Sequence, residues 1–418
     1  MSVIFGGNFM NNSSKPSLSK EQKLVIASTA TGFSFENMDF NFMSFALSSI
    51  IASLGISTVQ AGWITTITQW GVLLGGLLFG LLSDKYGRIK IFSYTIFIFA
   101  AGTALMYFAH NITTIYILRF LIGLGNGGEY GVGMALIAEH FAAKQYGRVS
   151  SVAAIGGQIG SILAAVLSAL ILPRLGWHVL FLVGVFPVIL AFFIRRNLKE
   201  SDTFITNQQK EDKPKVSFKR LFSTPKLSMQ TLGLICMVIV QAGGYFGLMN
   251  WLPTIVQKQL GISVRGSSLW MISTIIGMCI GMLVFGNILD HLGPQKSFGL
   301  FLFGAALVIY ILVRARNMIE LLILGAIVGF FANGMYGGYG AIINYLYPID
   351  IVATANSFIM NIGKFIGSFS TVVIGFLMSK LSMEGVMAFL SIMYLISFAI
   401  MMFLPGLKTM TKELRASK

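Results

Sequence analysis

Residues 80–90 read Gly-Leu-Leu-Ser-Asp-Lys-Tyr-Gly-Arg-Ile-Lys, a polar turn between two long apolar stretches. A related turn, Gly-Asn-Ile-Leu-Asp-His-Leu-Gly-Pro-Gln-Lys, occupies residues 286–296. Glycine, aspartate, glycine and lysine recur at matching positions of the two turns, 206 residues apart. Because the backbone of glycine adopts conformations closed to other residues, the second glycine permits a sharp turn. The shared offset predicts a chain built from two parallel repeats.

The same offset relates glycines in the apolar stretches that follow the turns. It pairs these positions: Gly123 with Gly329, Gly128 with Gly334, Gly131 with Gly337, and Gly157 with Gly363. Glycine is abundant, so the common offset carries more weight than any single match. Repeats of six helices with a binding site between the two halves are a transporter architecture.

The composition places this chain in a membrane. Of its 418 residues 55% are hydrophobic and 11% charged, whereas a soluble domain has about 25% charged residues. This excludes a soluble enzyme, a nucleic-acid binder and a disordered chain. The two cysteines lie inside apolar runs and the four histidines lie far apart, so neither a disulfide framework nor a metal site is predicted.

A membrane-spanning helix needs about 20 mainly apolar residues, and twelve stretches meet this requirement. They are 24–52, 58–83, 89–110, 113–138, 149–171, 178–194, 228–256, 266–289, 297–314, 318–346, 352–378 and 384–404. We therefore predict an all-α membrane protein of two six-helix bundles, 24–194 and 228–404. A polar linker, 195–227, joins the bundles, and tails of 1–23 and 405–418 flank them. The first tail is polar and basic, which is unlike a signal peptide.

The distribution of positive charge predicts the orientation. With both termini in the cytoplasm, cytoplasmic segments hold 22 of the 30 lysines and arginines, and the outer loops hold six. Lysine and arginine resist translocation, so this bias favours the arrangement.

The first turn has the composition of a cytoplasmic gate. Gly80 lets two helices approach closely, and Gly87 permits the turn. Asp84 and Arg88 are then placed to pair with charges near the same membrane surface. The predicted gate residues are Gly80, Asp84, Gly87, Arg88, Glu139, Arg148 and, in the second copy, Asp290. The alternative is that these charges only solvate a tight loop.

Five ionisable residues lie well inside predicted spans, namely Glu36, Asp39, Arg119, Glu129 and Lys364. Each costs about 3 kcal/mol at the bilayer centre, so they must pair or face water. Asp39, Arg119, Glu36 and Glu129 are predicted to couple protons, with a permanent ion pair or a packing role as the alternative. Lys364 is predicted to bind an anion, unless it only balances Asp39 or Glu36.

Polar and aromatic residues at similar depth are candidates for the same substrate site. They are Gln158, Asn126, Tyr245, Asn250, Asn333, Tyr336, Tyr339 and Asn361. Each could equally be a packing contact between helices.

These residues resemble a known family over essentially the whole chain. The turn at 80–90 resembles the signature loop of the major facilitator superfamily. The runs FENMDFNFMSF (35–45), RFLIGLGNGGEYG (119–131) and GWHVLFLVGVFPVILAFFIRRNLKES (176–201) resemble its metabolite:proton symporters, especially the sialate:proton symporter group. The resemblance implies that Asp39 and Arg119 couple proton and substrate. The chain departs from the family pattern at Asn37, where a second acid is frequent, and at His178, where an arginine is common.

The resulting expectation is a monomeric, proton-coupled importer of a small carboxylate in the plasma membrane, such as a sialic, aromatic or aliphatic acid. It needs no cofactor besides the proton and is not an enzyme. The alternatives are a proton-driven exporter and a non-transporting sensor. Exporters carry a proline-containing GPxxGG-like stretch, whereas residues 154–160 read AIGGQIG, and sensors add a large soluble extension.

Overall fold

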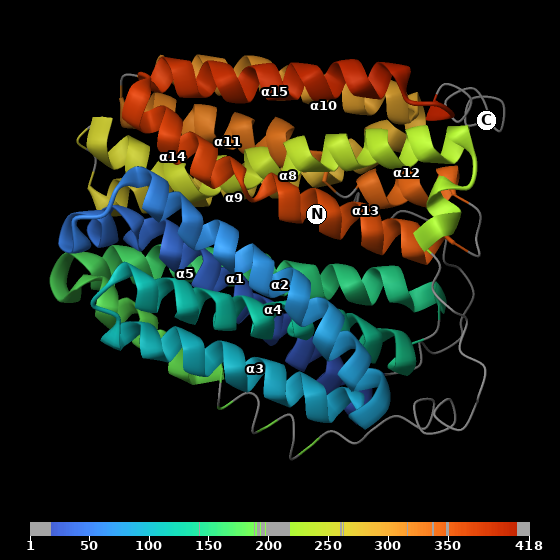
Figure 1. Cartoon of the computed structure of the whole chain (residues 1–418), viewed down its shortest axis with the longest axis horizontal. Helices are drawn as coiled ribbons and strands as arrows, with labels where there is room; N and C mark the ends of the chain where they lie inside the picture. The colour runs from blue at the N-terminus through green and yellow to red at the C-terminus, as the bar shows by residue number, and fades with distance from the viewer. Residues whose placement is uncertain are drawn as a thin grey trace, which may run out of the picture.

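The computed structural model describes residues 18–407 except 142, 188, 190–192, 194–196, 198–217, 260, 262, 316, 337 and 348–350. For some further residues it describes only the backbone. The described chain is helical, and its helices lie roughly side by side (Figure 1). This confirms the predicted all-α membrane class.

The N-terminal half begins at the Ser19 capping box, whose side chain accepts a hydrogen bond from the Gln22 amide. Its elements are α1 (Lys20–Leu54), α2 (Thr58–Tyr86), α3 (Arg88–Leu105), η2 (Met106–Phe108), α4 (Ile112–His140), α5 (Ala143–Phe181) and η3 (Leu182–Val185). The α5 segment is broken at Gly176, whose φ of 76° is a left-handed conformation that suits glycine. Residues after this break begin the sixth predicted span.

The C-terminal half follows a short helix, η4 (Phe218–Phe222). Its elements are α8 (Pro225–Gln259), α9 (Val264–Leu292), α10 (Pro294–Leu312), α11 (Met318–Gly334), α12 (Gly338–Leu346), α13 (Val352–Gly367), α14 (Ser370–Lys380) and α15 (Met383–Phe403). Two predicted spans are divided, 318–346 into α11 and α12, and 352–378 into α13 and α14. Eleven of the twelve predicted spans thus correspond to described helices, while 178–194 is described only in part.

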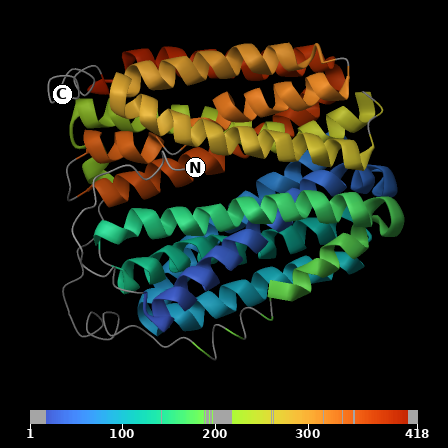
Figure 2. The ribbon, with the colours of Figure 1, turned by 180° about the vertical axis from the view of Figure 1, so that it is seen from behind.

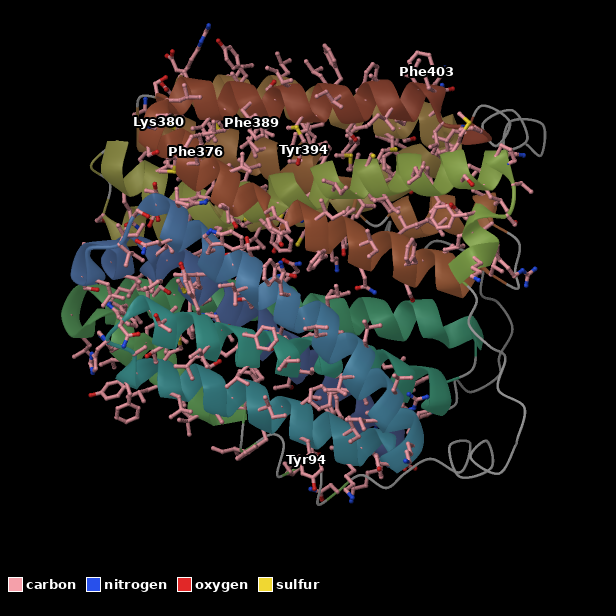
Figure 3. All side chains as sticks on the ribbon, in the orientation of Figure 1. Tyr94, Phe376, Lys380, Phe389, Tyr394 and Phe403 are labelled. Atoms are coloured by element: carbon pink, nitrogen blue, oxygen red, sulfur yellow. The ribbon has the colours of Figure 1, made fainter. Side chains whose placement is uncertain are left out.

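Nine described helices are long and apolar enough to cross a membrane. Large apolar side chains cover the outside of the bundle, including Leu81 at 73% exposure and Phe403 at 83%. Figure 3 shows Phe403 on α15 and Tyr94 on α3 at opposite flanks of the molecule. Such a surface is stable against lipid and unstable in water.

The predicted repeat is visible in the packing of the two halves. A Cβ on Gly123 of α4 would meet the Thr68 carbonyl of α2, and a Cβ on Gly329 of α11 would meet the Thr274 carbonyl of α9. The glycine and the residue whose carbonyl it contacts both lie 206 residues later in the second half than in the first. The same relation holds for Gly71 with Phe120 and for Gly277 with Ala326. Close glycine packing therefore joins α2 to α4 and α9 to α11 in the same way.

The two related turns also have related backbones, with φ of 110° at Gly87 and 79° at Gly293. The predicted sharp turns are therefore confirmed. The predicted close approach at Gly80 is wrong in this conformation, because nothing lies within 4 Å of a Cβ built there. The helix contacts on α2 instead use Gly71 and Gly75, about one and a half to two and a half turns earlier.

The two halves lie beside each other, α1 to α5 in one and α8 to α15 in the other (Figures 1 and 2). The helix α1 begins, and α15 ends, on the same side of the molecule, which we call the terminal face. The other side, where α1 ends and α2 begins, is the opposite face. Hydrogen bonds from Gln22 to the His140 carbonyl (2.9 Å) and from Gln230 to the Pro405 carbonyl (3.0 Å) tie helix ends together on the terminal face.

Candidate functional site

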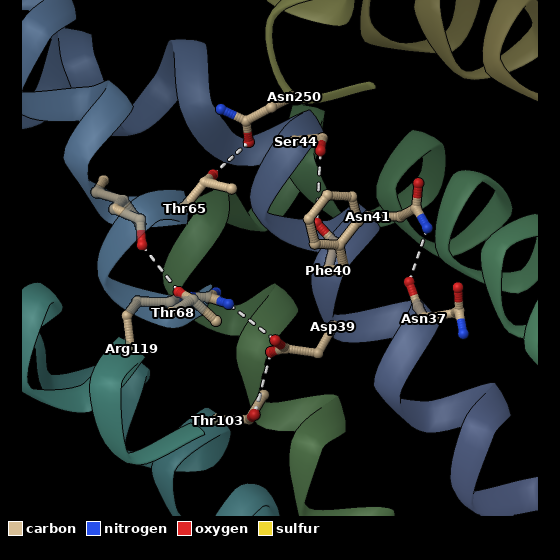
Figure 4. A network of polar contacts seen from close by, with 11 residues as sticks. Asn37, Asp39, Phe40, Asn41, Ser44, Thr65, Thr68, Thr103, Arg119 and Asn250 are labelled. Atoms are coloured by element: carbon tan, nitrogen blue, oxygen red, sulfur yellow. Dashed lines mark hydrogen bonds and ion pairs between the residues drawn. The ribbon is translucent and has the colours of Figure 1, made fainter. Parts of the chain in front are cut away.

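Asp39 and Arg119 form an ion pair inside the N-terminal half (Figure 4). Arg119 Nη1 donates to Asp39 Oδ2 at 2.8 Å, and Thr103 Oγ1 of α3 donates to Asp39 Oδ1 at 3.0 Å. The Arg119 guanidinium lies 5.0 Å from the centre of the Phe181 ring. Asp39 is 2% exposed and Arg119 1%, so the pair is enclosed by α1, α3, α4 and the end of α5.

Lys364 lies within electrostatic range of the other helix-one acid, Glu36. Lys364 belongs to α13 in the C-terminal half, whereas Glu36 belongs to α1. The Lys364 ammonium also lies 5.6 Å from the centre of the Tyr336 ring. Tyr245 of α8 is within electrostatic range of Lys364, Tyr336 and Glu36. These half-buried side chains, from both halves, form a group that we call the central cluster.

An aromatic contact lies next to the central cluster, toward the opposite face. Phe40 follows Glu36 by one turn of α1 and stacks on Tyr245, with ring centroids 6.0 Å apart and an interplanar angle of 14°. Phe246 packs on the same Phe40 ring at 5.9 Å. Ring stacking therefore joins α1 to α8 beside the charges.

Glu129 is buried completely between α4 and α1. Its carboxyl lies directly on the α1 backbone, where a Cβ at Gly32 would collide with Glu129 Oε1. Glu129 interacts electrostatically with Glu36, which follows Gly32 by one turn. Gly32, Glu36 and Asp39 thus share one side of α1, and Glu129 of α4 packs against that side.

Four of the other predicted substrate residues differ in whether their side chains are accessible or occupied by helix contacts. Gln158 on α5 is half-buried and Asn361 on α13 is exposed, so neither side chain is enclosed in a helix contact. Asn333 and Tyr339 are packing contacts instead. Asn333 Oδ1 accepts from Gln241 at 3.0 Å, and the Tyr339 hydroxyl donates to the Met237 carbonyl at 3.3 Å.

Two further candidates have distinct surroundings. Asn250 of α8 accepts a hydrogen bond from Thr65 of α2 at 2.9 Å, which links the halves (Figure 4). Asn126 of α4 is 5% exposed, and its Oδ1 has no protein hydrogen-bond partner.

The predicted cytoplasmic gate is described only in part. Arg88 Nη1 donates to Ser83 Oγ at 3.1 Å, which places the guanidinium beside the end of α2. The side chains of Asp84, Glu139, Arg148 and Asp290 lie outside the described residues.

Sequence reasoning missed a seam of small and hydroxyl residues that joins the halves near the opposite face. Thr371 of α14 donates to the Gly62 carbonyl of α2 at 2.8 Å, and Thr66 donates to the Ser368 carbonyl at 3.0 Å. Thr58 donates to the Gly375 carbonyl at 2.6 Å. We call this set the α2–α14 seam. Its signal in the sequence is the spacing of four residues between Thr58, Gly62 and Thr66, and between Thr371 and Gly375.

In the described part of the chain, no three histidine, cysteine, aspartate or glutamate side chains are placed to hold a metal ion. The side chains described at the site can provide charge pairing, hydrogen bonding and ring contact.

Comparison with known proteins agrees with this arrangement. The family model of the Major Facilitator Superfamily matches residues 29–313 and 255–417. A protein of Haemophilus influenzae named for metabolite transport is 39% identical over 391 residues, covering 92% of this chain and 96% of its own. The sialic acid transporter NanX of Escherichia coli is 29% identical over 349 residues, covering 82% of this chain and 84% of its own.

A solved structure has the same fold. It is a bacterial homologue of the human lysosomal transporter Spinster, which superimposes with a TM-score of 0.77 at 14% identity. The match covers 94% of this chain and 98% of that one. The chain belongs to the Major Facilitator Superfamily, whose members are membrane transporters and not enzymes.

Proposed function

We propose that this protein imports a small organic anion together with a proton, by alternating access between its two halves. The observation that carries the proposal is the central cluster, where Lys364 of one half lies within electrostatic range of Glu36 of the other. A cationic side chain between two moving halves can bind an acidic side chain in one conformation and a substrate anion in another. The relative NanX is named for sialic acid, itself a carboxylate.

The proposed substrate site is the central cluster with Gln158 and Asn361. Lys364 binds the carboxylate, and the amides meet polar groups of the ligand. Asn126, Asn250, Asn333 and Tyr339 are placed inside helix contacts, which makes them weaker candidates for direct binding. The Phe40–Tyr245 stack covers the site on the side of the opposite face.

Proton coupling is proposed to follow from the balance of charge. Glu36, Asp39 and Glu129 stand against Arg119 and Lys364, so with all five ionised the site would repel an anion. Protonation of Asp39 leaves two acids against two bases and favours anion binding. Asp39 remains the proposed coupling acid because it already holds Arg119, with Glu36 and Glu129 next in order.

The direction is proposed from the charge bias of the loops, which makes the terminal face cytoplasmic. The α2–α14 seam then closes the extracellular side, and this conformation faces inward. Export is the second candidate, but the helix-five sequence lacks the proline typical of exporters.

Uptake into proteoliposomes tests the proposal. An inward proton gradient should concentrate a labelled carboxylate from a panel of sialic, aromatic and short aliphatic acids. Collapse of the gradient with a protonophore should return the internal concentration to the external one. Accumulation that survives the protonophore, or proton-driven loss of preloaded substrate, would contradict proton-driven import.

A further inference from the structure

The side of α4 that packs on α1 carries buried polar atoms with no protein hydrogen-bond partner. These atoms are both carboxyl oxygens of Glu129, Oδ1 of Asn126, and Nε and Nη2 of Arg119. The three side chains are at most 5% exposed. Most buried polar groups in proteins have a hydrogen-bond partner, so this concentration calls for a physical reason.

Helix geometry and three contacts show where these atoms point. Positions 119, 126 and 133 are separated by two helical turns each, and 129 lies one turn from 126, so all four share a side. Arg119 contacts Asp39, Glu129 contacts Gly32, and a Cβ on Gly133 would lie 3.1 Å from Thr29 Cγ2. All three partners belong to α1, so Asn126 lies in the seam between α4 and α1.

The unpartnered groups are complementary along this seam. Arg119 offers two donors at one end, and Asn126 and Glu129 offer three acceptors toward the other. Residues 119 and 129 are about 15 Å apart along the helix axis, too far for direct bonds. A water molecule can donate and accept hydrogen bonds at the same time, and buried water commonly bonds to polar groups that lack a protein partner.

We propose that buried water in the α1–α4 seam connects Asp39 to Glu129 and forms a proton route inside the N-terminal half. This route is separate from the substrate site between the halves, and it rests on the proton coupling proposed above. When Asp39 gives up its proton, the proton moves along the hydrogen-bonded waters and neutralises the Glu129 carboxylate. Asp39 then remains as the carboxylate paired with Arg119, and only O–H bonds are exchanged.

The charged groups around the route support this direction of transfer. Glu36 on α1 interacts with both Asp39 and Glu129, and Lys364 on α13 interacts with Glu36. From α3, the neutral side chains of Thr103 and Phe92 contact this region. An ionised Glu129 would therefore meet a neighbouring acid and no described base, which favours its uncharged form.

Toward the terminal face the seam ends in an apolar cluster. Val25 of α1 and Val132 and Leu136 of α4 are buried in this cluster. A proton held at Glu129 is therefore separated from the terminal face in this conformation. Such separation prevents a proton from crossing without substrate.

Asn126→Leu tests the route because leucine has a similar size and no hydrogen-bonding group. We expect proton-driven accumulation in proteoliposomes to fall by about tenfold or more. Exchange of internal for external substrate without a gradient should keep its KM within about twofold. Asn126→Ser, which leaves room for water, should restore part of the accumulation.

Ser168→Ala is the matched control, because Ser168 is also buried with an unpartnered hydroxyl but belongs to α5. It should change neither measurement. A raised KM for exchange in Asn126→Leu would show that Asn126 binds substrate and would overturn the route. Unchanged accumulation in that variant would overturn it as well.

Infrared spectroscopy of the full-length protein gives a readout that does not require transport. The carbonyl band of a protonated buried carboxyl should disappear in Glu129→Gln and shift in Asn126→Leu, where the bridging water is lost. If the position of this band is unchanged in Asn126→Leu, the proposed water connection between Asn126 and Glu129 is refuted. Absence of proton-driven uptake in the unaltered protein would instead refute the proposed function, while the band still reports on the seam.

Discussion

At the scale of single residues, the two helix-one acids have different surroundings although they are three positions apart. Asp39 is enclosed within one half and bound by Arg119 and Thr103, whereas Glu36 faces a lysine of the other half. Burial strengthens the Asp39–Arg119 attraction but makes it costly to remove one partner. The carboxyl that holds Arg119 and the carboxyl within electrostatic range of Lys364 are therefore distinct.

Asp39→Asn should abolish accumulation driven by a proton gradient and leave substrate exchange measurable. The amide keeps an acceptor for Thr103 but can neither carry a proton nor balance Arg119 electrostatically. The measurement compares gradient-driven uptake with exchange in the same proteoliposomes. Thr103→Val, which removes the hydrogen bond and keeps the charge, should reduce accumulation without abolishing it. If Asp39→Asn still concentrates substrate, coupling belongs to Glu36 or Glu129.

Lys364→Gln should weaken the binding of carboxylates far more than that of their neutral amides. Loss of an opposite-charge partner in a partly desolvated site costs about 2–5 kcal/mol, or roughly 30- to several-thousand-fold in affinity. Competition by acid and amide pairs against a labelled substrate measures the difference. Equal weakening of both members of a pair would mean that Lys364 serves only to balance Glu36.

At the scale of helices, the α2–α14 seam joins the halves by neutral hydrogen bonds at close backbone approach. A Cβ on Gly62 would meet the Thr371 carbonyl, with the Val372 Cα only 2.8 Å away. Backbone atoms cannot yield as a flexible side chain does. The seam therefore depends on the absence of a side chain at Gly62.

Gly62→Ala should shift the protein toward conformations open at the opposite face. An overlap of this kind costs about 1–3 kcal/mol, which changes the ratio of the two conformations by roughly 5- to 150-fold. Spin labels at Ala52→Cys and Leu381→Cys, both exposed near that face, should report longer distances. Gly76→Ala on the same helix is the control, since its nearest neighbour, the Gly127 carbonyl, is 3.5 Å away. Unchanged label distances in Gly62→Ala would show that the seam does not control opening.

The sequence predicts the helices and the repeat well, because both depend on local hydropathy and on glycine spacing. It also predicts Asp39 and Arg119 as coupling residues through the resemblance to symporters, with a permanent ion pair between them as the alternative. It does not predict the rotation of each helix, and this rotation brings Asp39 to Arg119 and brings Glu36 within electrostatic range of Lys364. The same limit hid the α2–α14 seam and made Tyr339 a false substrate candidate, since its hydroxyl is occupied by the Met237 carbonyl.

At the scale of the whole molecule, the halves are joined near the opposite face by the α2–α14 seam and by a Ser48–Gln257 hydrogen bond of 2.6 Å. Asn361 of α13 lies nearer the terminal face than this seam, and its side chain is exposed. In this conformation the proposed substrate residue Asn361 therefore lies on the terminal-face side of the α2–α14 seam.

A single cysteine at Asn361, in a protein with Cys236→Ser and Cys279→Ser, should be labelled by an impermeant maleimide from the terminal face alone. In right-side-out vesicles the label should not react, and in inverted vesicles it should react rapidly. Substrate that drives the halves through their cycle should slow the reaction. Equal labelling from both sides would contradict a closed opposite face.

The glycine-to-carbonyl contacts that recur after 206 residues have a counterpart at the boundary between the halves. A packing contact that occurs twice at one offset is the pattern expected of one repeated six-helix unit. The boundary between the halves repeats in the same way, because α2 packs on α14 and their counterparts at the 206-residue offset, α9 and α5, pack on each other. The interior of each half and the boundary between them therefore both follow the repeat.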